Sequence, residues 1–299
     1  MSGWDGSGLP PAAAARMRRA EASPLATSML SVPSAFGMEA VGFDPVGEVM
    51  GCIVSQIGWR GYGGCGLWGN PRYGYGASAP VITSRSSGYS GFGAYVSALT
   101  HGYRTALGRL LTEARALGAD GVVGIKLTAR PLTEGYTREF VALGTAVRGR
   151  CRSRPATPFT TELAGTDVAK LLMSGWTPVA LRMGIEVAIR HDDWRTQSQA
   201  GSRLFNTANV EVTGYTDLVQ QARALAREHL RAEIATAGAD GGIVSDVSLR
   251  IWELEPAENH RDHVAEATVT GTAIARFDSP GGSSAATLTM LPLRTSRRS

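Results

Sequence analysis

An internal repeat is the sequence feature that most limits how this chain can fold. The stretch LGADGVVGIKL (residues 117–127) returns in similar form as AGADGGIVSDVSL (residues 237–249). Two further matches keep the same order: GFDPVGEVMG (42–51) with GWTPVALRMG (175–184), and ALGTAVRGR (142–150) with TVTGTAIAR (268–276). Self-similarity at a long, nearly fixed period is the mark of a repeated supersecondary unit. The sequence therefore predicts two copies of one fold unit in tandem.

Each copy contains the same expected elements. A short helix (166–175 in copy two) precedes a strand (178–189), and a long helix follows after a variable loop. The helix is marked by apolar residues at every third or fourth position: Tyr103, Ala106, Leu107, Leu110, Leu111, Ala114 and Leu117 in copy one, and Leu218, Ala222, Leu225, Ala226, Leu230 and Ile234 in copy two. Gly118 and Gly238 fall where these stripes end, which favours a left-handed helix terminus and a turn. A buried strand and a last strand then predict a β-hairpin, so the fold class is α+β.

The three matches also set the domain boundaries. We expect a mobile N-terminal segment over residues 1–26, copy one over 27–150 with a long loop at 59–93, a linker over 151–157, copy two over 158–278, and a mobile C-terminal tail over 279–299. Both ends of the chain are rich in Pro, Gly, Ser and Ala, a composition typical of mobile termini.

Composition narrows the class of protein. Hydrophobic residues make up 43% of the 299 residues and charged residues 19%, which is typical of a globular protein with a core. Three cysteines without regular spacing argue against a disulfide framework or a thiolate zinc site. Apolar runs such as 121–125 are too short for a membrane span, and the first residues lack a secretory pattern. We therefore expect a cytoplasmic protein with no membrane partner.

The glycine-alanine-aspartate turn, its buried strand and the later Gly-Thr-Ala strand resemble the YbjQ-like family, which is also labelled the heavy-metal-binding domain. The resemblance covers residues 27–150 and 158–278, and in copy two it includes GADGGIVSDVSL and ATVTGTAIARF. It implies subunits that assemble into closed rings, typically pentamers, and it assigns no reaction. For a tandem chain this implies a homo-oligomer, with five chains in two stacked tiers, one per copy, favoured over a ring with an even number of units.

The loop at residues 59–93 interleaves glycine with aromatic residues and arginines. Arginine beside aromatic rings can stack on bases and neutralise phosphates in single-stranded nucleic acid. Long loops within compact domains are usually functional or disordered. The prediction favoured here is that this loop contacts another subunit or a sheet edge, with disorder as the second interpretation and nucleic-acid binding as the minor one.

Histidines and carboxylates gather in copy two and form the candidate metal site. His191, Asp192 and Asp193 follow the first strand, whereas His260, Asp262 and His263 precede the last. If these strands are neighbours, the two clusters meet at one sheet end, and imidazole with carboxylate suits zinc or another divalent ion. The repeat weighs against this hypothesis, because no histidine has a histidine at the equivalent position of the other copy. Solvated loop polarity is therefore the favoured interpretation, and a divalent metal ion is the only cofactor that the sequence suggests.

Two acidic residues recur at equivalent positions, Glu113 with Glu233 and Asp120 with Asp240. They could form paired carboxylate sites, but a surface glutamate and a turn-forming aspartate are the simpler interpretation. Nucleophilic catalysis has no motif such as GxSxG to support it. The sequence thus favours a non-enzymatic, homo-oligomeric assembly or binding module. The alternative is a protein that binds a divalent or heavy metal, or a small ligand, through the His/Asp clusters of copy two.

Overall fold

The computed structural model describes residues 4, 8–22, 27–57, 79, 81–84, 91–132, 137–152, 154–201, 210–257 and 260–277. Copy one contains α2 (Val32–Ala40), β1 (Phe43–Gln56), α3 (Gly91–Ala116), β3 (Gly121–Pro131) and β4 (Thr137–Gly149). Copy two contains α4 (Gly165–Met173), β6 (Trp176–His191), α6 (Thr213–Thr236), β7 (Gly241–Ala257) and β8 (His260–Arg276). The remaining elements are α1 (Pro11–Glu21), β2 (Val81–Thr83), β5 (Phe159–Thr160) and α5 (Trp194–Gly201).

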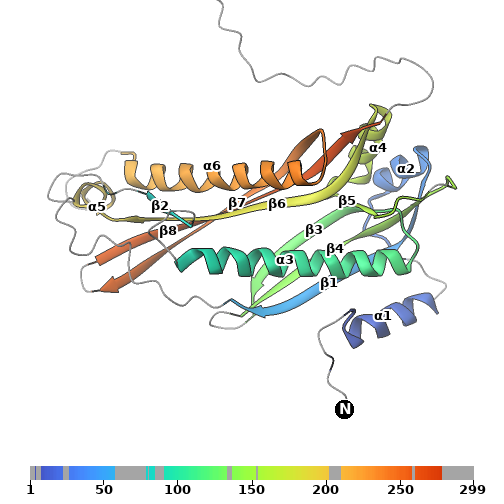
Figure 1. Cartoon of the computed structure of the whole chain (residues 1–299), viewed down its shortest axis with the longest axis horizontal. Coiled ribbons are helices and arrows are strands. Elements are labelled where there is room, and N and C mark those ends of the chain that lie inside the picture. The colour runs from blue at the N-terminus through green and yellow to red at the C-terminus, as the bar shows by residue number, and fades with distance from the viewer. Residues whose placement is uncertain are drawn as a thin grey trace, which may run out of the picture.

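The two copies share one topology. One four-stranded sheet has the order β1-β4-β3-β5, and the other has the order β2-β6-β8-β7. In both sheets the last strand of the copy lies between the first and second strands and pairs with each in antiparallel fashion. Each long helix packs along the sheet of its own copy, α3 on the first sheet and α6 on the second (Figure 1). The predicted α+β fold of two equivalent units is therefore confirmed.

The recurring Gly-Ala-Asp-Gly motif is a helix end fastened to a strand. Gly118 and Gly238 have φ angles of 65° and 66°, which glycine adopts without the steric cost that a Cβ would bring. In copy one the carboxylate of Asp120 accepts a hydrogen bond from the backbone N–H of Gly149 at 2.7 Å. In copy two Asp240 accepts one from the N–H of Arg276 at 2.9 Å. The motif recurs because both copies need this connection between the long helix and the last strand.

The copies exchange strands at their sheet edges. Strand β2, which comes from the long loop of copy one, pairs antiparallel with β6 of copy two, with Ile82 opposite Ile189. Strand β5, at the start of copy two, pairs parallel with β3 of copy one, with Val122 opposite Thr160. The predicted contact of the 59–93 loop with a sheet edge is confirmed for residues 81–83, and the edge belongs to the same chain. Residues 58–78, 80 and 85–90 of that loop region lie outside the described residues.

One hydrophobic core spans both copies. It joins Val49 and Leu110 of copy one to Leu181 and Ile185 of copy two, and each of these side chains is buried. Side chains alternate between the two faces of a strand, so β6 turns one face to this shared core and the other to α6. A second cluster, between α6 and β8, includes Leu218 and Leu230 of the helix. Burial of apolar surface therefore holds the copies together as well as each copy within itself.

The N-terminal segment expected to be mobile contains a helix. Residues 11–21 form α1, and Arg16 on that helix forms an ion pair with the buried Glu113 of α3. A buried carboxylate requires a partner of opposite charge or hydrogen-bond donors, which gives this part of the segment a fixed contact. None of the described helices is long and apolar enough to cross a membrane.

Candidate functional site

The interface between the copies is formed first by backbone hydrogen bonds. The N–H groups of Phe159 and Thr161 donate to the carbonyls of Asp120 and Val122, each at 3.0 Å. In the opposite direction, Gly124 and Ile125 of β3 donate to the carbonyls of Leu163 and Thr161, also at 3.0 Å. Because the bonded atoms belong to the backbone, the leading segment of copy two completes the sheet of copy one largely without regard to side-chain identity.

Glycines permit close approach at this interface. A Cβ atom at Gly121 would lie 2.2 Å from the ring of Phe159, which also meets Phe43 edge to face at a centroid distance of 5.9 Å. Helices α2 and α4 pack on each other, and a Cβ at Gly165 would lie 2.6 Å from the carbonyl oxygen of Ser34. Small residues at these points allow backbone and ring to meet at van der Waals distance.

A polar group also crosses the interface. The hydroxyl of Tyr95 in copy one donates a hydrogen bond of 2.5 Å to Glu266 in copy two. Arg138 donates to the same hydroxyl at 2.7 Å and lies 3.5 Å from the Glu266 carboxylate. The Arg138 and Glu266 side chains are only 14% and 12% exposed. Burial, followed by the nearby Glu266 charge, raises the pKa of Tyr95 above its usual value, so the tyrosine stays a neutral donor.

The acids that recur in both copies take separate partners and form no carboxylate pair. The interpretation of Glu113 as a surface residue is wrong, because its side chain is only 1% exposed. It accepts a hydrogen bond of 2.9 Å from the backbone N–H of Met50 in addition to its ion pair with Arg16. The equivalent Glu233 forms an ion pair of 2.9 Å with Arg104 of copy one. The interpretation of Asp120 and Asp240 as turn residues agrees with their bonds to the last strands.

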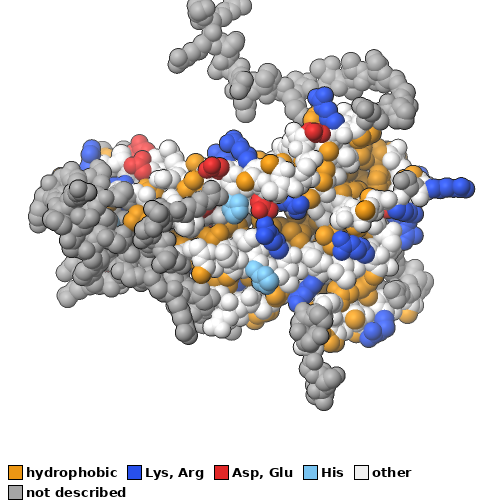
Figure 2. Space-filling view, viewed as in Figure 1, with side chains coloured by type: hydrophobic (Ala, Val, Ile, Leu, Met, Phe, Trp, Pro, Cys, Tyr) orange, Lys and Arg blue, Asp and Glu red, His pale blue; other side chains and the backbone are white. Residues whose placement is uncertain are grey.

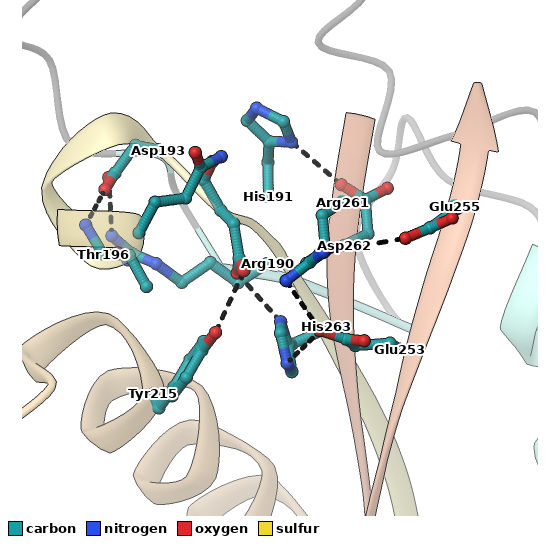
Figure 3. A network of polar contacts seen from close by, with 12 residues as sticks. Arg190, His191, Asp193, Thr196, Tyr215, Glu253, Glu255, Arg261, Asp262 and His263 are labelled. Atoms are coloured by element: carbon teal, nitrogen blue, oxygen red, sulfur yellow. Dashed lines mark hydrogen bonds and ion pairs between the residues drawn. The ribbon is translucent and has the colours of Figure 1, made fainter. Parts of the chain in front are cut away.

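Figure 3 shows the polar cluster at one end of the second sheet, where the candidate metal residues lie. The register of β6 and β8 places His191 opposite Asp262. His191 Nδ1 lies 3.0 Å from an oxygen of Asp262. His263 Nδ1 lies 2.9 Å from an oxygen of Asp192, and its Nε2 lies 3.3 Å from Glu253. The expected meeting of the two sequence clusters at one sheet end is thus present for these residues.

Two residues of the candidate metal site do not join these pairs. Asp193 turns toward α5, where it accepts a 2.8 Å hydrogen bond from the Thr196 N–H and pairs with Arg190 at 2.9 Å. Burial opposes ionisation of this carboxyl, but the backbone donors at Ala79 and Thr196 prevail and lower its pKa. His260 belongs to β8, opposite Ala257, and its side chain lies outside the described part of the structure.

Two members of the cluster had no signal in the sequence, because they come from other elements. Tyr215 on α6 donates a 3.0 Å hydrogen bond to Asp192, and Glu253 comes from β7. Burial, together with the charge of Asp192, raises the pKa of Tyr215, so its hydroxyl remains a donor. Only the packing of α6 and β7 around β8 brings these residues together.

The imidazole and carboxylate groups of this cluster pair with one another and do not converge on one point. While His263 contacts a carboxylate through each nitrogen, neither nitrogen offers a lone pair to a metal. Among the described residues, no group of three or more His, Cys, Asp or Glu is placed to hold a metal ion. The arrangement fastens the ends of β6, β7, β8 and α6 to one another.

Basic side chains are dispersed over the face that Figure 2 presents. Lysine and arginine side chains stand apart there, among hydrophobic and uncharged ones, with no continuous basic area. Nucleic-acid binding draws on clustered positive charge, and most of the loop for which that alternative was raised lies outside the described residues.

Comparison with known proteins agrees with the repeated fold. The YbjQ family model, described as "Putative heavy-metal-binding", matches residues 83–150. The chain is 31% identical over 284 residues to the "Encapsulin nanocompartment protein Rv1762c" of Mycobacterium tuberculosis, across 91% of this chain and 94% of that protein. It is 42% identical over 53 residues to a UPF0145 protein of Clostridium perfringens, across 18% of this chain and 49% of that protein. No solved structure matches. The chain belongs to the YbjQ-like family and carries two YbjQ-like units in tandem.

Proposed function

We propose that this chain is a non-enzymatic building block that assembles with copies of itself as a component of a protein nanocompartment. The exchange of strands between its two units carries the proposal. Each unit leaves a sheet edge that the other unit completes, β3 by β5 and β6 by β2. A unit built in this way is suited to association edge to edge.

The relative of similar length supports the nanocompartment part of the proposal. Its name describes an encapsulin nanocompartment protein, and the similarity extends over 94% of its length. The candidate site supports a non-catalytic role, because two of its histidines, His191 and His263, are engaged with the carboxylates of Asp262 and Asp192. The two units of a chain exchange strands side by side. This favours an assembly in which the two kinds of unit are neighbours in one layer, and disfavours two stacked tiers that each contain one kind of unit.

Native mass spectrometry of the purified chain tests self-assembly. We expect a mass that is a fixed multiple of 31.5 kDa, stable across a wide range of concentration, and particles of uniform size in electron micrographs. A chain that remains monomeric at all concentrations would contradict the proposal.

The second candidate is binding of a divalent metal or a small ligand in copy two. The observation in its favour is that the strand register brings two histidine–carboxylate pairs to one sheet end, His191 with Asp262 and His263 with Asp192. A carboxylate on one ring nitrogen is the contact that orients metal-bound histidines in proteins. Metal analysis of the purified chain separates this candidate from the first.

A further inference from the structure

We propose that the outer edge of β7, with the groove beside it, binds residues 27–30 of a second copy of this chain. The proposal rests on the assembly function above and names the surface and the segment that carry it out. Its basis is that the two copies have one fold but different surroundings.

The edge strands of the two copies differ in one respect. In copy one, β3 is covered on its outer side by β5 of copy two, through the backbone hydrogen bonds of Asp120, Val122, Gly124 and Ile125. In copy two, the equivalent strand β7 is the last strand of its sheet within the described part of the chain. An edge strand exposes a row of backbone donors and acceptors ready to pair with another chain.

A groove of about 450 Å³ runs between this edge and α6. Its apolar part includes Leu230, Ile234 and Val244, and it continues over Gly241 and Gly242. Val244 is 52% exposed. At the position equivalent to the exposed Gly242, copy one has Val122, which is fully buried. Copy two therefore covers this surface on copy one, whereas the equivalent surface on copy two itself is exposed.

The segment that fits this edge follows from the repeat. Alignment of Gly42 with Gly175 places residues 27–30 at positions 160–163, the segment that pairs with β3. Thr160 and Thr161 are buried, at 5% and 0% exposure, whereas their equivalents Thr27 and Ser28 are exposed. Residues 160–163 are thus covered by the neighbouring strand β3, whereas the equivalent residues 27–30 have no such strand beside them among the described residues.

The equivalence specifies the bonds of the new contact. The N–H of Ser28 would donate to the carbonyl of Gly242, as that of Thr161 donates to Val122. The N–H of Val244 would donate to the carbonyl of Leu30, as that of Gly124 donates to Leu163. These backbone pairs need no match of side chains, so divergence of the two copies does not prevent them.

Helix α2 adds apolar surface next to the segment. Val32 and Phe36 are 84% and 73% exposed. Their equivalents in copy two, Gly165 and Ala169, lie against α2 in the contact between the copies. Exposed apolar side chains on the equivalent face are typical of a protein–protein contact. The bulkier pair indicates that α2 stands further from its partner helix in the contact between chains.

The contact joins two different surfaces and is therefore head-to-tail, in contrast to a two-fold contact of like with like. This property gives the test. Ser28→Pro removes the N–H of the segment and leaves the β7 edge intact, whereas Val244→Asp places a charge in the groove and leaves the segment intact. Every contact needs one segment and one edge, so in a pure population of either variant each chain should lose both of its contacts with neighbours.

Native mass spectrometry and thermal unfolding are measured for each variant and for an equimolar mixture. Alone, each variant should associate at least about tenfold more weakly than the wild type, and its thermal unfolding should remain cooperative, with a melting temperature lowered only by the lost association. In the mixture, the intact edge of the Ser28→Pro chain takes the intact segment of the Val244→Asp chain, and a two-chain species should form.

Matched controls isolate the contact. Thr27→Pro alters the residue equivalent to Thr160. The hydroxyl oxygen of Thr160 accepts a hydrogen bond from the Leu181 N–H within copy two, and the N–H of Thr160 makes none of the backbone hydrogen bonds to β3 given above. Ile251→Asp charges a residue of β7 that is 49% exposed and lies beyond the paired stretch. Both controls should keep the wild-type mass.

The outcomes separate the two proposals. A wild-type oligomer that survives both Ser28→Pro and Val244→Asp, or a mixture that stays monomeric, overturns the proposed surface while self-assembly stands. A wild-type chain that is monomeric at all concentrations overturns self-assembly and the surface together.

Discussion

Ala226 of α6 lies directly over Gly184 of β6, where a Cβ atom on the glycine would be 2.0 Å from the alanine carbonyl oxygen. Copy one repeats the relationship, with a Cβ at Gly51 only 1.9 Å from the carbonyl oxygen of Ala106. The obstacle is backbone, which cannot turn aside as a flexible side chain can. The helix therefore crosses its sheet at a point that only glycine permits.

Gly184→Ala should lower the free energy of unfolding by about 1–3 kcal/mol, because the helix must move away from the strand. Chemical denaturation measures the change. The control is Gly108→Ala on α3, where a Cβ would meet nothing within 4 Å and where alanine should add about 0.5–1 kcal/mol by helix propensity. Equal effects of the two substitutions would contradict the close crossing.

The contact of Arg138 with Glu266 should be strongly coupled across the copies. Arg138→Met leaves a mostly buried carboxylate without its cation and should lower the free energy of unfolding by about 3 kcal/mol. Combining it with Glu266→Gln should recover a large part of that loss, because no charge then remains unpaired. A double-mutant cycle measures the coupling, and additive effects would argue against the pair.

Asp193 should stabilise the start of α5 in a pH-dependent way. Asp193→Ala removes the acceptor of the Thr196 N–H and should cost about 1 kcal/mol at neutral pH. The pKa of Asp193 is lowered in the fold, so this stability is present above the unfolded value of 3.8 and is lost as pH falls through the folded value. Asp193→Asn keeps one acceptor oxygen but has no charge to pair with Arg190, so it should retain only part of the stability, and that part should not depend on pH. Denaturation across the acid range compares the three chains, and a pH-independent difference would refute the linkage.

The contribution of Glu162 to stability should depend on pH in the opposite direction to that of Asp193. Burial raises its pKa, although hydrogen bonds from Ser245 and Thr270 oppose the shift. The charged form is then disfavoured in the fold, so stability is highest below the unfolded value of 4.5 and falls as pH rises through the folded value. Glu162→Gln should therefore raise the melting temperature at pH 7, with a gain that disappears below pH 4.5. A gain that persists in acid would show that burial of charge is not its cause.

The polar cluster of copy two should behave as a structural network. Elemental analysis of the purified wild type should find far less than one zinc per chain, and His263→Ala should leave that content unchanged while lowering stability by about 1–2 kcal/mol. His101→Ala, at an exposed position on α3, serves as the control. Metal near one per chain that is lost in His263→Ala and kept in His101→Ala would favour the metal-binding candidate.

The sequence by itself determined the repeated unit and most of its elements, since these depend on local signals. The apolar stripe from Tyr103 to Leu117 predicted α3, and the glycine at 118 predicted where it ends, because periodicity and backbone freedom act within a few residues. The histidine–carboxylate clusters were expected at one sheet end only on the condition that their two strands are neighbours, and the pairing of β6 with β8 met that condition.

The tertiary structure alone decided which edge each strand joins and which charges find partners. Nothing local to Val81–Thr83 or Phe159–Thr160 marks them as strands of the other copy's sheet, because a short strand is stabilised only by the edge it meets. For the same reason the sequence suggested that Glu113 is a surface residue, because its partners on α1 and β1 are distant in the sequence. The hydrogen bond from Tyr215 to Asp192 likewise depends on the packing of α6 on its sheet. Pairings between distant segments depend on the packing of whole elements, and a single sequence encodes that packing without displaying it.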